Sequence, residues 1–414
     1  MKILIIGSGG REHAIGWKLK QNPDVTLYFA PGNGGTADIG ENVNIKVDEI
    51  SKLADFAKKE KVDMTIAGPE LPLTLGVADE FNKRGLKIFG PGAEAAKLEG
   101  SKAFAKRFMQ KYGIPTAQYD SVTTLDEGIQ ILEQRTFPLV IKADGLAAGK
   151  GVIICQNKAE AKTALKDMLE SSIFGDAGNT VVIEEFLTGK EVSLLCFTDG
   201  ETIIPMETAS DYKRALDNDM GANTGGMGSI SPSQYYTPGL GDEIAAKTLK
   251  GIKNEGFDYR GVIYIGLILT PEGPKVLEYN ARFGDPETEA LLPRLESDLT
   301  EIVSAVVEKR LCECKICWSD KKAVSVIMTS EGYPGQYETG YEIDIPETES
   351  LVFHAGTTKK AGEPSPCLVT AGGRVLAITS LGSSFNDARN IVYNDIKKIN
   401  FKGKTYRIDI GDIK

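Results

Sequence analysis

The sequence contains few of the residues that build metal clusters, because its 414 residues include two histidines and six cysteines. Cys312, Cys314 and Cys317 lie close together, but a structural zinc site needs a fourth ligand. The only histidines, His13 and His354, belong to other motifs of the chain, which explain them better than a zinc site does. We therefore expect the three cysteines to be reduced thiols at the end of a helix, in a reducing cytosol, without bound metal.

The sequence also lacks an excess of positive charge and any long apolar run. Its formal net charge is −10, whereas binding to a nucleic-acid backbone requires a basic surface, so we expect no nucleic-acid partner. Local lysines and arginines must therefore contact any phosphate group. No apolar run approaches the roughly 20 residues that a membrane-spanning helix needs. The opening segment, residues 2–7, is too short for a secretory signal, and we expect a cytoplasmic protein that contacts no membrane.

Residues 1 to about 100 alternate between apolar strand-like runs and amphipathic helical segments, and the length of the chain allows several domains. We expect strands at residues 3–6, 26–30, 64–67 and 88–89, and helices at residues 11–20, 50–59 and 75–84. This rhythm predicts a doubly wound parallel sheet whose ligands bind at the carboxyl ends of the strands. Glycines follow each strand at that edge, namely Gly7, Gly10, Gly32, Gly34, Gly68 and Gly90.

The first of these turns invites comparison with a dinucleotide-binding fingerprint. That fingerprint requires G-x-G-x-x-G and an acidic residue after the second strand. Glu12 stands at the third glycine position, and the second strand ends in Ala30-Pro31-Gly32. The sequence therefore argues against an NAD- or flavin-dependent dehydrogenase.

The segment from Val276 to Thr288 places oxygen ligands and a guanidinium directly after a strand. Because alternate side chains of a strand share a face, we expect Glu278, Asn280 and Arg282 on one face and Leu277 and Tyr279 on the other. One carboxylate and one amide oxygen suit Mg²⁺, which completes its shell with water and phosphate oxygens. The arginine beside them suits an anionic group that is transferred across the metal. A solvated strand edge is the alternative interpretation.

A second candidate phosphate-binding element spans residues 138–154, where two apolar runs flank a loop of small residues. Backbone N–H groups in such a loop can approach phosphate oxygens without obstruction. Lys142 enters from the first run, and the loop contains Gly149, Lys150 and Gly151. It is not a Walker A loop, because a strand follows where a helix is required. An ordinary glycine-rich hairpin remains the alternative.

Together these elements resemble the ATP-grasp superfamily and, within it, the glycinamide ribonucleotide synthetase family. The resemblance covers the chain from end to end through short segments in the family's order: residues 7–13, 30–36, 68–70, 89–91, 98–102, 223–228, 282–288 and 353–357. It implies a multidomain α/β and α+β fold. Residues 1–100 form an N-terminal α/β domain, residues 101–322 an ATP-grasp domain pair with a lid subdomain at about 123–187, and residues 323–414 a small C-terminal α+β domain. We expect the larger antiparallel sheet at residues 192–197, 203–206, 262–269 and 274–279.

The activity that the resemblance implies is ATP-dependent ligation of glycine to 5-phosphoribosylamine, in de novo purine synthesis. Glycyl phosphate is the expected intermediate, and ADP, phosphate and the ribosylated glycinamide are the products. The implied cofactors are ATP and Mg²⁺ or Mn²⁺, and the expected partners are small molecules bound by a monomer. Another ATP-grasp carboxylate–amine ligase, or a bicarbonate- or formate-using relative, is the alternative. An inactive nucleotide-binding regulator should have lost a lysine or a metal ligand, and none is lost here.

The resemblance also implies roles for individual residues. The catalytic residues are Arg282, Lys142 and Asp285, and the metal ligands are Glu278 and Asn280. The nucleotide-binding residues are Lys102, Lys142, Gly149, Lys150, Gly151, Glu184, Leu187 and Glu191. The acceptor substrates are expected at Gly10, Arg11, Glu12, Asn33, Gly34, Thr36, Glu70, Asp211, Lys213, Asn223, Arg282, Asp285 and Thr288.

Two questions stay open at the sequence level. Many members of the superfamily carry a second metal-binding carboxylate upstream of the Glu278 position, but residues 264–268 contain no acid here. The number of metal ions is therefore not fixed by the sequence. A zwitterionic glycine needs an anion for its ammonium group, and either Asp211 or Asp285 can supply it.

Overall fold

The apolar run that opens the chain forms the centre of a five-stranded parallel sheet in the computed structural model, which describes residues 1–146, 151–171, 175–360 and 367–413. Side chains on both faces of its first strand are buried in separate cores: Ile3 and Ile5 pack in one cluster, and Leu4 and Ile6 in another. Burial on both faces explains why this strand is continuously apolar. The strand order is β3 (Glu41–Asn42), β2 (Thr26–Pro31), β1 (Lys2–Gly7), β4 (Met64–Ala67) and β5 (Ile88–Phe89).

Helices α1 (Gly10–Leu19), α2 (Thr36–Ile39), α3 (Ile50–Lys59), α4 (Glu70–Thr74) and α5 (Val77–Lys83) connect these strands. The helix predicted near residues 75–84 corresponds to α5, which begins at Val77. Gly76 has a left-handed conformation with φ of +83° and separates α4 from α5. Residues other than glycine adopt this conformation rarely, so the glycine allows the chain to turn between two short helices.

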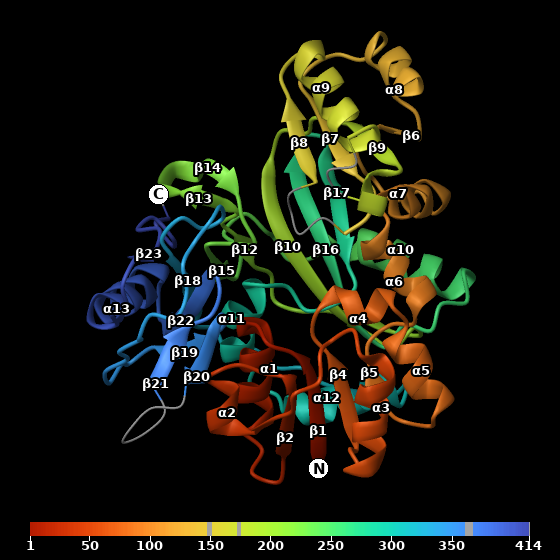
Figure 1. The fold of residues 1–414 in the computed structure, drawn as a ribbon. Coiled ribbons are helices and arrows are strands. Elements are labelled where there is room, and N and C mark those ends of the chain that lie inside the picture. Colours follow the sequence, from red (N-terminus) through yellow and green to blue (C-terminus); the bar gives the residue numbers. More distant parts are fainter. Residues whose placement is uncertain (147–150, 172–174, 361–366, 414) are drawn as a thin grey trace.

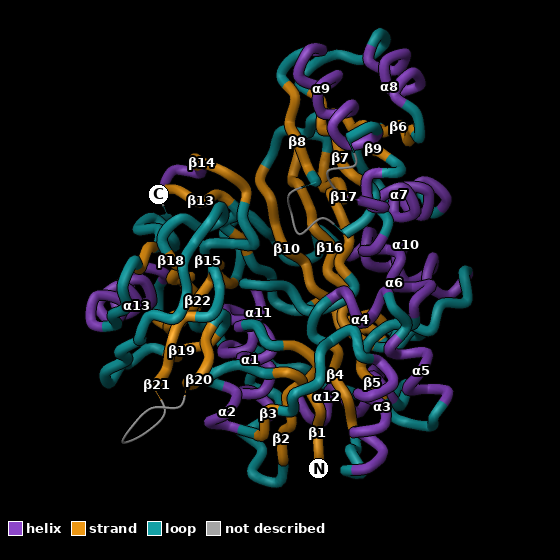
Figure 2. The backbone as a smooth tube through the Cα atoms, in the orientation of Figure 1, coloured by secondary structure: helices purple, strands orange, loops and turns teal. Residues whose placement is uncertain are grey.

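A separate upper lobe, residues 119–185, contains a four-stranded antiparallel sheet (Figure 1). The strand order is β6 (Tyr119–Val122), β9 (Val181–Glu185), β7 (Leu139–Ala143) and β8 (Val152–Cys155), and the helices are α8 (Leu125–Leu132), α9 (Lys158–Leu169) and η1 (Gly175–Gly178). The two longer helices lie on the outer side of this sheet (Figure 2). Residues 147–150 of the predicted phosphate loop lie outside the described residues.

The larger antiparallel sheet contains the four strands predicted from the sequence. Their order is β11 (Ile203–Pro205), β10 (Lys190–Thr198), β16 (Gly261–Thr270) and β17 (Gly273–Asn280). Helices α6 (Ala93–Gly100), α7 (Lys102–Lys111) and α10 (Asp242–Asn254) supply core residues to one face, including Leu98, Phe108 and Ile252. On the other face, Phe197 and Phe283 pack into the same core as the first sheet, which joins the two parts of the chain.

The C-terminal part forms a six-stranded sheet that also takes strands from the middle of the chain. The strand order in the sheet is β12 (Ser210–Asp211), β15 (Gly228–Ser231), β18 (Lys322–Ser330), β22 (Arg374–Gly382) and β19 (Leu351–His354). Strand β23 (Lys404–Thr405) also pairs with β18. The remaining elements are β13 (Arg214–Leu216), η2 (Asp217–Asp219), β14 (Met220–Asn223), α11 (Glu287–Leu291), η3 (Leu292–Arg294), α12 (Leu299–Val307), η4 (Leu311–Glu313), β20 (Thr357–Lys360), β21 (Cys367–Thr370) and α13 (Phe385–Lys398). Residues 210–231 are thereby anchored on the C-terminal sheet.

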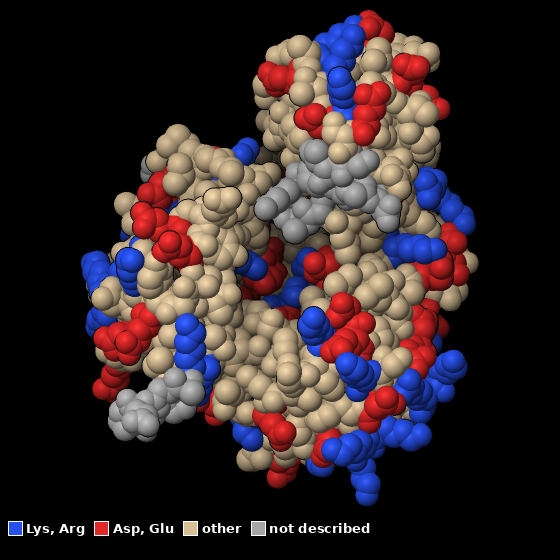
Figure 3. All heavy atoms as spheres, viewed as in Figure 1, with Lys and Arg blue, Asp and Glu red and all other residues tan. Residues whose placement is uncertain are grey.

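A cleft lies between the upper lobe and the rest of the molecule, and acidic and basic side chains gather inside it (Figure 3). Figure 1 shows β17 beside β16, between the upper lobe and the N-terminal sheet. No helix among residues 1–146, 151–171, 175–360 and 367–413 is long and apolar enough to span a membrane.

The N-terminal and C-terminal parts meet at a pair of histidines, of which His13 is buried and His354 is half-buried. The backbone N–H of His354 donates a hydrogen bond to Nδ1 of His13 at 2.8 Å, and the two ring centroids are 5.4 Å apart. Burial, reinforced by the neighbouring His354, lowers the pKa of His13 to about 3. Burial also lowers the pKa of His354 to about 4, with Asp38 opposing and Lys359 assisting the shift. Both rings are therefore neutral in the folded protein at neutral pH.

We expect acid to weaken this junction before the carboxylates titrate. A neutral buried histidine stabilises the fold fully above its unfolded pKa of about 6.5, and this stability is lost as the pH falls toward the folded pKa. For His13 the loss between about pH 7 and pH 5 is about 2 kcal/mol. Thermal melting should show a steeper fall over this range for the wild type than for His13→Asn. Parallel melting curves would contradict the assignment.

Candidate active site

Strand β17 presents the predicted metal ligands, but it does not alternate as regularly as the sequence suggested. Gly266 of β16 pairs with Glu278 and Leu267 pairs with Val276, so Leu277 is the extra residue of a β-bulge. Val276 and Tyr279 are both buried in the core, whereas Leu277 lines the same cavity as Glu278. The prediction that Leu277 points away from Glu278 was therefore wrong. The bulge shifts the alternation of side chains between the two faces of the strand by one residue.

The carboxylate of Glu278 lies among positive charges. Burial raises its pKa, but Lys213, Lys142, Lys102 and Arg282 together outweigh burial and leave the pKa below its usual value. Glu278 is therefore an anion at neutral pH. An ionised carboxylate that faces several cations is suited to a divalent cation and a polyphosphate, which bring charges of both signs.

The oxygen atoms of Glu278 and Asn280 show which kind of metal ion would fit this site. Among the described residues, no group of three or more His, Cys, Asp or Glu side chains could hold a metal ion. Glu278 and Asn280 offer one carboxylate and one amide oxygen, and the amide oxygen accepts only a long hydrogen bond from Arg282, at 3.3 Å. Such a sparse set fits Mg²⁺ or a similar hard cation that binds mostly water and phosphate oxygens.

Two lysines predicted to contact phosphate come from separate elements. Lys102 is the first residue of α7, and its Nζ donates to the carbonyl oxygen of Gly145 at 3.1 Å. Nζ of Lys142, on β7, lies 2.9 Å from Oε1 of Glu184. Because β7 belongs to the upper lobe and α7 to the larger body, the two ammonium groups approach the cleft from different sides.

Glu184 has partners that the sequence did not suggest. Its buried carboxylate also lies 3.1 Å from Nζ of Lys106, so one anion balances two lysines. We predicted Glu184 at the nucleotide-binding hinge, together with Leu187, and that role stays a prediction. Glu191, which we predicted to contact ribose, forms an ion pair with Lys213 at 2.8 Å. Gly149 and Lys150 lie outside the described residues, while the carbonyl of Gly151 accepts a hydrogen bond from Ala143 at 2.8 Å.

Arg282 is oriented by acidic residues from the first third of the chain. Its Nη2 lies 2.9 Å from Oε1 of Glu99, and its Nε lies 3.5 Å from Oε2 of Glu70. Glu99 also accepts the backbone N–H of Ala281 at 2.7 Å, which fixes the turn after β17. Glu70 was predicted as a substrate residue, whereas the role of Glu99 was missed because no local pattern pairs residues so far apart.

The predicted rim of the N-terminal sheet is held by buried polar contacts. Arg11 and Glu12 form a buried ion pair at 2.6 Å, and the carboxylate of Glu12 accepts the N–H of Gly9. The side chain of Asn33 accepts the N–H of Thr36 at 3.0 Å. Gly10 begins α1, and the N–H of Gly34 donates to the carbonyl of Thr357. This rim therefore also connects the N-terminal and C-terminal parts.

Asp285 is joined to the C-terminal sheet by an arginine that the sequence analysis missed. Arg374, the first residue of β22, binds both carboxylate oxygens of Asp285, at 2.8 and 2.9 Å. The same guanidinium donates to the carbonyl of Gly225 at 2.6 Å. The hydroxyl of Thr288 is buried and donates to the carbonyl of Gly284, and Asn223 is exposed at the end of β14. Arg374 has no local sequence signal that would have identified it.

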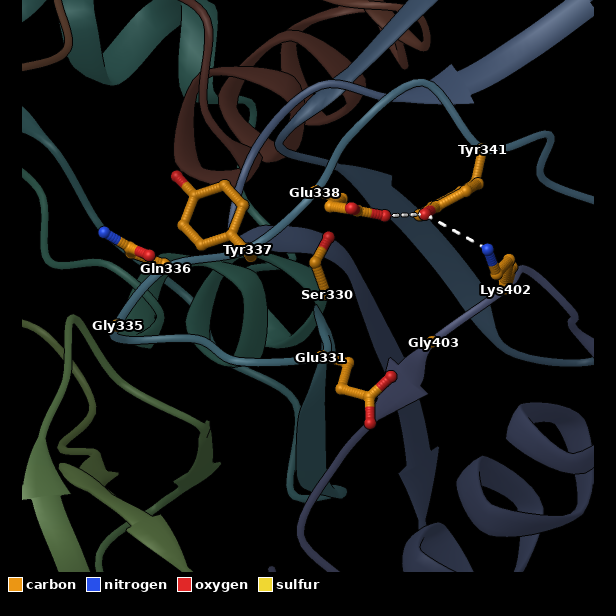
Figure 4. Close-up of a pocket in the computed structure, with 9 residues that line it drawn as sticks. All are labelled: Ser330, Glu331, Gly335, Gln336, Tyr337, Glu338, Tyr341, Lys402 and Gly403. Atoms are coloured by element: carbon orange, nitrogen blue, oxygen red, sulfur yellow. Dashed lines mark hydrogen bonds between the residues drawn. The ribbon is translucent and has the colours of Figure 1, made fainter.

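A hollow of about 690 Å³ in the C-terminal part is separate from these residues (Figure 4). None of the predicted site residues lines it. Glu338 and Lys402 both point toward the hydroxyl of Tyr341 there. Tyr333, close in sequence to this hollow, has a hydroxyl that accepts the N–H of Gly225 at 3.0 Å. The three clustered cysteines are unpaired, and Cys312 and Cys317 are exposed.

Comparison with known proteins places this geometry in one family. Residues 1–99 match the N domain, residues 100–288 the ATP-grasp (A) domain and residues 323–413 the C domain of phosphoribosylglycinamide synthetase. The chain is 51% identical to a phosphoribosylamine–glycine ligase of Caldanaerobacter subterraneus, over 99% of both chains. It is 47% identical to the Vibrio vulnificus enzyme of that name, over 99% of this chain and 98% of the relative.

Solved structures agree with these matches. The crystal structure of phosphoribosylamine–glycine ligase from Thermotoga maritima has a TM-score of 0.87 and 38% identity, and the match covers 99% of this chain and all of that one. A biotin carboxylase domain from Hydrogenobacter thermophilus, solved with MgADP and bicarbonate, has a TM-score of 0.73 at 15% identity, over 98% of this chain and 91% of that one. At that identity the second likeness concerns the fold alone.

Proposed function

This chain belongs to the phosphoribosylglycinamide synthetase family, and we propose that it joins the carboxyl group of glycine to the amine of 5-phosphoribosylamine, with hydrolysis of ATP to ADP and phosphate. The observation that carries the proposal is the convergence of Glu278, Asn280 and Arg282 with two lysines in one cleft, in a chain similar to such ligases over its whole length. The reaction belongs to purine biosynthesis.

The charges of the cleft suit a nucleoside triphosphate. Lys102 and Lys142 would neutralise its phosphate oxygens from the two sides of the cleft. Glu278 and Asn280 would hold a divalent cation, for which we propose Mg²⁺ or Mn²⁺. Such a cation, when bound, stabilises negative charge that develops on the transferred phosphoryl group.

Two steps account for the products. A carboxylate oxygen of glycine attacks the γ-phosphorus of ATP, and ADP leaves, which gives glycyl phosphate. The amine of phosphoribosylamine then attacks the carbonyl carbon, phosphate leaves and the nitrogen loses a proton, which forms the amide. Arg282, fixed by Glu99, would bind the carboxylate and then the acyl phosphate. No protein nucleophile is required, so the residues act by positioning and charge neutralisation.

The proposal is tested by ADP release measured with ATP and a divalent cation. ADP should form rapidly only when glycine and phosphoribosylamine are both present. Formate or bicarbonate in place of glycine should give no increase over the background rate. Equal stimulation by bicarbonate would favour a carboxylase instead.

We propose further that the enzyme acts as a monomer in the cytoplasm. The support is compositional, since the chain carries a net charge of −10, which disfavours association through like-charged surfaces. Light scattering of the purified protein at working concentration measures the mass directly. A mass twice that of the chain would refute the monomer.

A further inference from the structure

Asp285 lies where the three parts of the chain meet. It follows the strand that leads into the predicted metal ligands, and an added Cβ on Gly9, in the turn after β1, would be 3.7 Å from its Oδ2. Burial raises its pKa, but three arginines, Arg374, Arg11 and Arg282, outweigh burial and keep the pKa below its usual value. Asp285 is therefore an anion surrounded by arginines from the C-terminal, N-terminal and middle parts of the chain.

Arg374 is the arginine that fixes this carboxylate in place. Its guanidinium binds both oxygens of Asp285, at 2.8 and 2.9 Å, and also donates to the carbonyl oxygen of Gly225 at 2.6 Å. Bidentate pairs of arginine and carboxylate are strong and geometrically specific. Arg374 therefore connects Asp285 to the turn that contains Gly225.

Tyr333 holds the same turn through a second contact. Its hydroxyl accepts the N–H of Gly225, so both backbone groups of Gly225 are bound by side chains that lie 108 and 149 residues away in the sequence. An added Cβ on Gly225 would be 3.2 Å from Cζ of Arg374 and 3.4 Å from the hydroxyl oxygen of Tyr333. The two side chains therefore leave the turn little room to move. We call Tyr333 and Arg374 the clamp.

The clamped turn packs directly on the segment that follows Asp285. Gly226 has a φ of +109°, which residues other than glycine rarely adopt. An added Cβ on Gly226 would be 2.3 Å from Cδ of Pro286 and 2.9 Å from Oδ1 of Asp211. Because the turn touches Pro286 and Arg374 binds Asp285, the turn and Asp285 form one unit. Its position depends on the C-terminal part of the chain.

This unit lies on the side of the cleft that faces the N-terminal sheet. Ligands of a doubly wound sheet bind at the carboxyl ends of its strands, and Gly9 follows β1 at that edge. Among the residues that the structure describes, neither side chain of the clamp forms a hydrogen bond or ion pair with the predicted phosphate-binding lysines or metal ligands. Loss of the clamp should therefore disturb the amine substrate more than ATP.

We propose that Arg374 and Tyr333 are positioning residues for the second step of the proposed reaction, in which the amine attacks glycyl phosphate. The inference rests on the proposed function, since that reaction defines the step. The clamp holds Asp285 and the turn against the N-terminal sheet, so that the amine reaches the carbonyl carbon before water does.

Without the clamp, water competes with the amine. Water attacks the carbonyl carbon of glycyl phosphate, phosphate leaves and the attacking oxygen loses a proton, which returns glycine and phosphate. ATP is then consumed without formation of the amide. A purely structural role of the clamp would not separate these two products.

The test measures ADP and the ribosylated glycinamide in the same reaction, with ATP, Mg²⁺, glycine and phosphoribosylamine. The wild type should form one ADP for each amide. Tyr333→Phe removes one hydroxyl group, and Arg374→Lys keeps the charge but loses the two-point contact with Asp285. Amide formation should fall about 5-fold in Tyr333→Phe and about 30-fold in Arg374→Lys. ADP formation should fall less in both, and the KM for ATP should change less than about threefold.

Two matched controls accompany these variants. Tyr337→Phe removes the hydroxyl of a neighbouring tyrosine, whose ring centroid lies 6.3 Å from that of Tyr333 and whose hydroxyl forms no hydrogen bond within the described part of the chain. Arg260→Lys removes a bidentate arginine that binds Asp258 near the surface. Both should keep rates within about twofold of the wild type and one ADP for each amide.

The outcomes separate the two proposals. If the wild type forms no ADP with glycine and phosphoribosylamine, the proposed function fails and the inference fails with it. If the wild type is active and both clamp variants still form one ADP for each amide, the positioning role fails alone. A folding defect, seen in melting curves, lowers both products equally. Should Arg374→Lys not fold, Tyr333→Phe decides, because it keeps the ring that packs against Gly373.

Discussion

Glu278→Gln is expected to lower kcat by roughly 1000-fold without unfolding the protein. The amide keeps the size of the side chain but removes the anion that faces Lys213, Lys142 and Lys102. Of the two proposed metal ligands, Glu278 is the carboxylate, so the cation would lose its charged ligand. Asn280→Ala should lower kcat by a smaller factor, because an amide oxygen is a neutral ligand. Steady-state rates over a titration of Mg²⁺, with melting curves for each variant, measure both effects.

A matched control for this variant is Glu272→Gln, in the turn that precedes β17. Glu272 is an exposed glutamate on the same hairpin, and it forms an ion pair with Lys275 at 2.9 Å. Exposed pairs contribute little, so we expect its rate to stay within about twofold of the wild type. Near-normal turnover of Glu278→Gln and Asn280→Ala at saturating Mg²⁺ would overturn the assignment of the metal ligands.

Arg282→Lys is expected to reduce kcat by about 100-fold while the affinity for ATP changes little. The guanidinium binds Glu99 at 2.9 Å and the carbonyl of Phe283 at 3.2 Å, and its Nε faces Glu70 at 3.5 Å. One ammonium group cannot satisfy these acceptors and also bind a carboxylate in two places. Turnover at saturating substrates and equilibrium binding of a non-hydrolysable ATP analogue give the two quantities separately.

Arg260→Lys provides the control for loss of a bidentate arginine elsewhere. Arg260 forms a two-bond pair with Asp258 near the surface, at 2.9 and 2.5 Å, and none of the predicted site residues is involved. Its replacement should leave kcat within about twofold, as expected for a surface pair. If ATP affinity collapsed in Arg282→Lys while kcat at saturating ATP survived, Arg282 would instead be a nucleotide-binding residue.

Sequence patterns alone were enough to predict the family, the order of the lobes and the strand that leads into Glu278, Asn280 and Arg282. These features are local: strand periodicity, glycine turns and short motifs depend on neighbours within a few residues. The four strands of the larger sheet were predicted for the same reason. The roles proposed for the individual site residues stay predictions.

The contacts that hold these residues in place became visible in the three-dimensional fold. Glu99 accepts the N–H of Ala281, which is 182 residues away in the sequence. Arg374 binds Asp285, which is 89 residues away. No spacing rule links residues so far apart, because their proximity depends on how whole sheets and helices pack. The bulge at Leu277 was equally hidden, since one extra residue changes the face of a strand without changing its composition. The sequence left Asp211 and Asp285 equivalent. The fold distinguishes them, because Arg374 binds both carboxylate oxygens of Asp285, whereas Oδ1 of Asp211 has no hydrogen-bond partner.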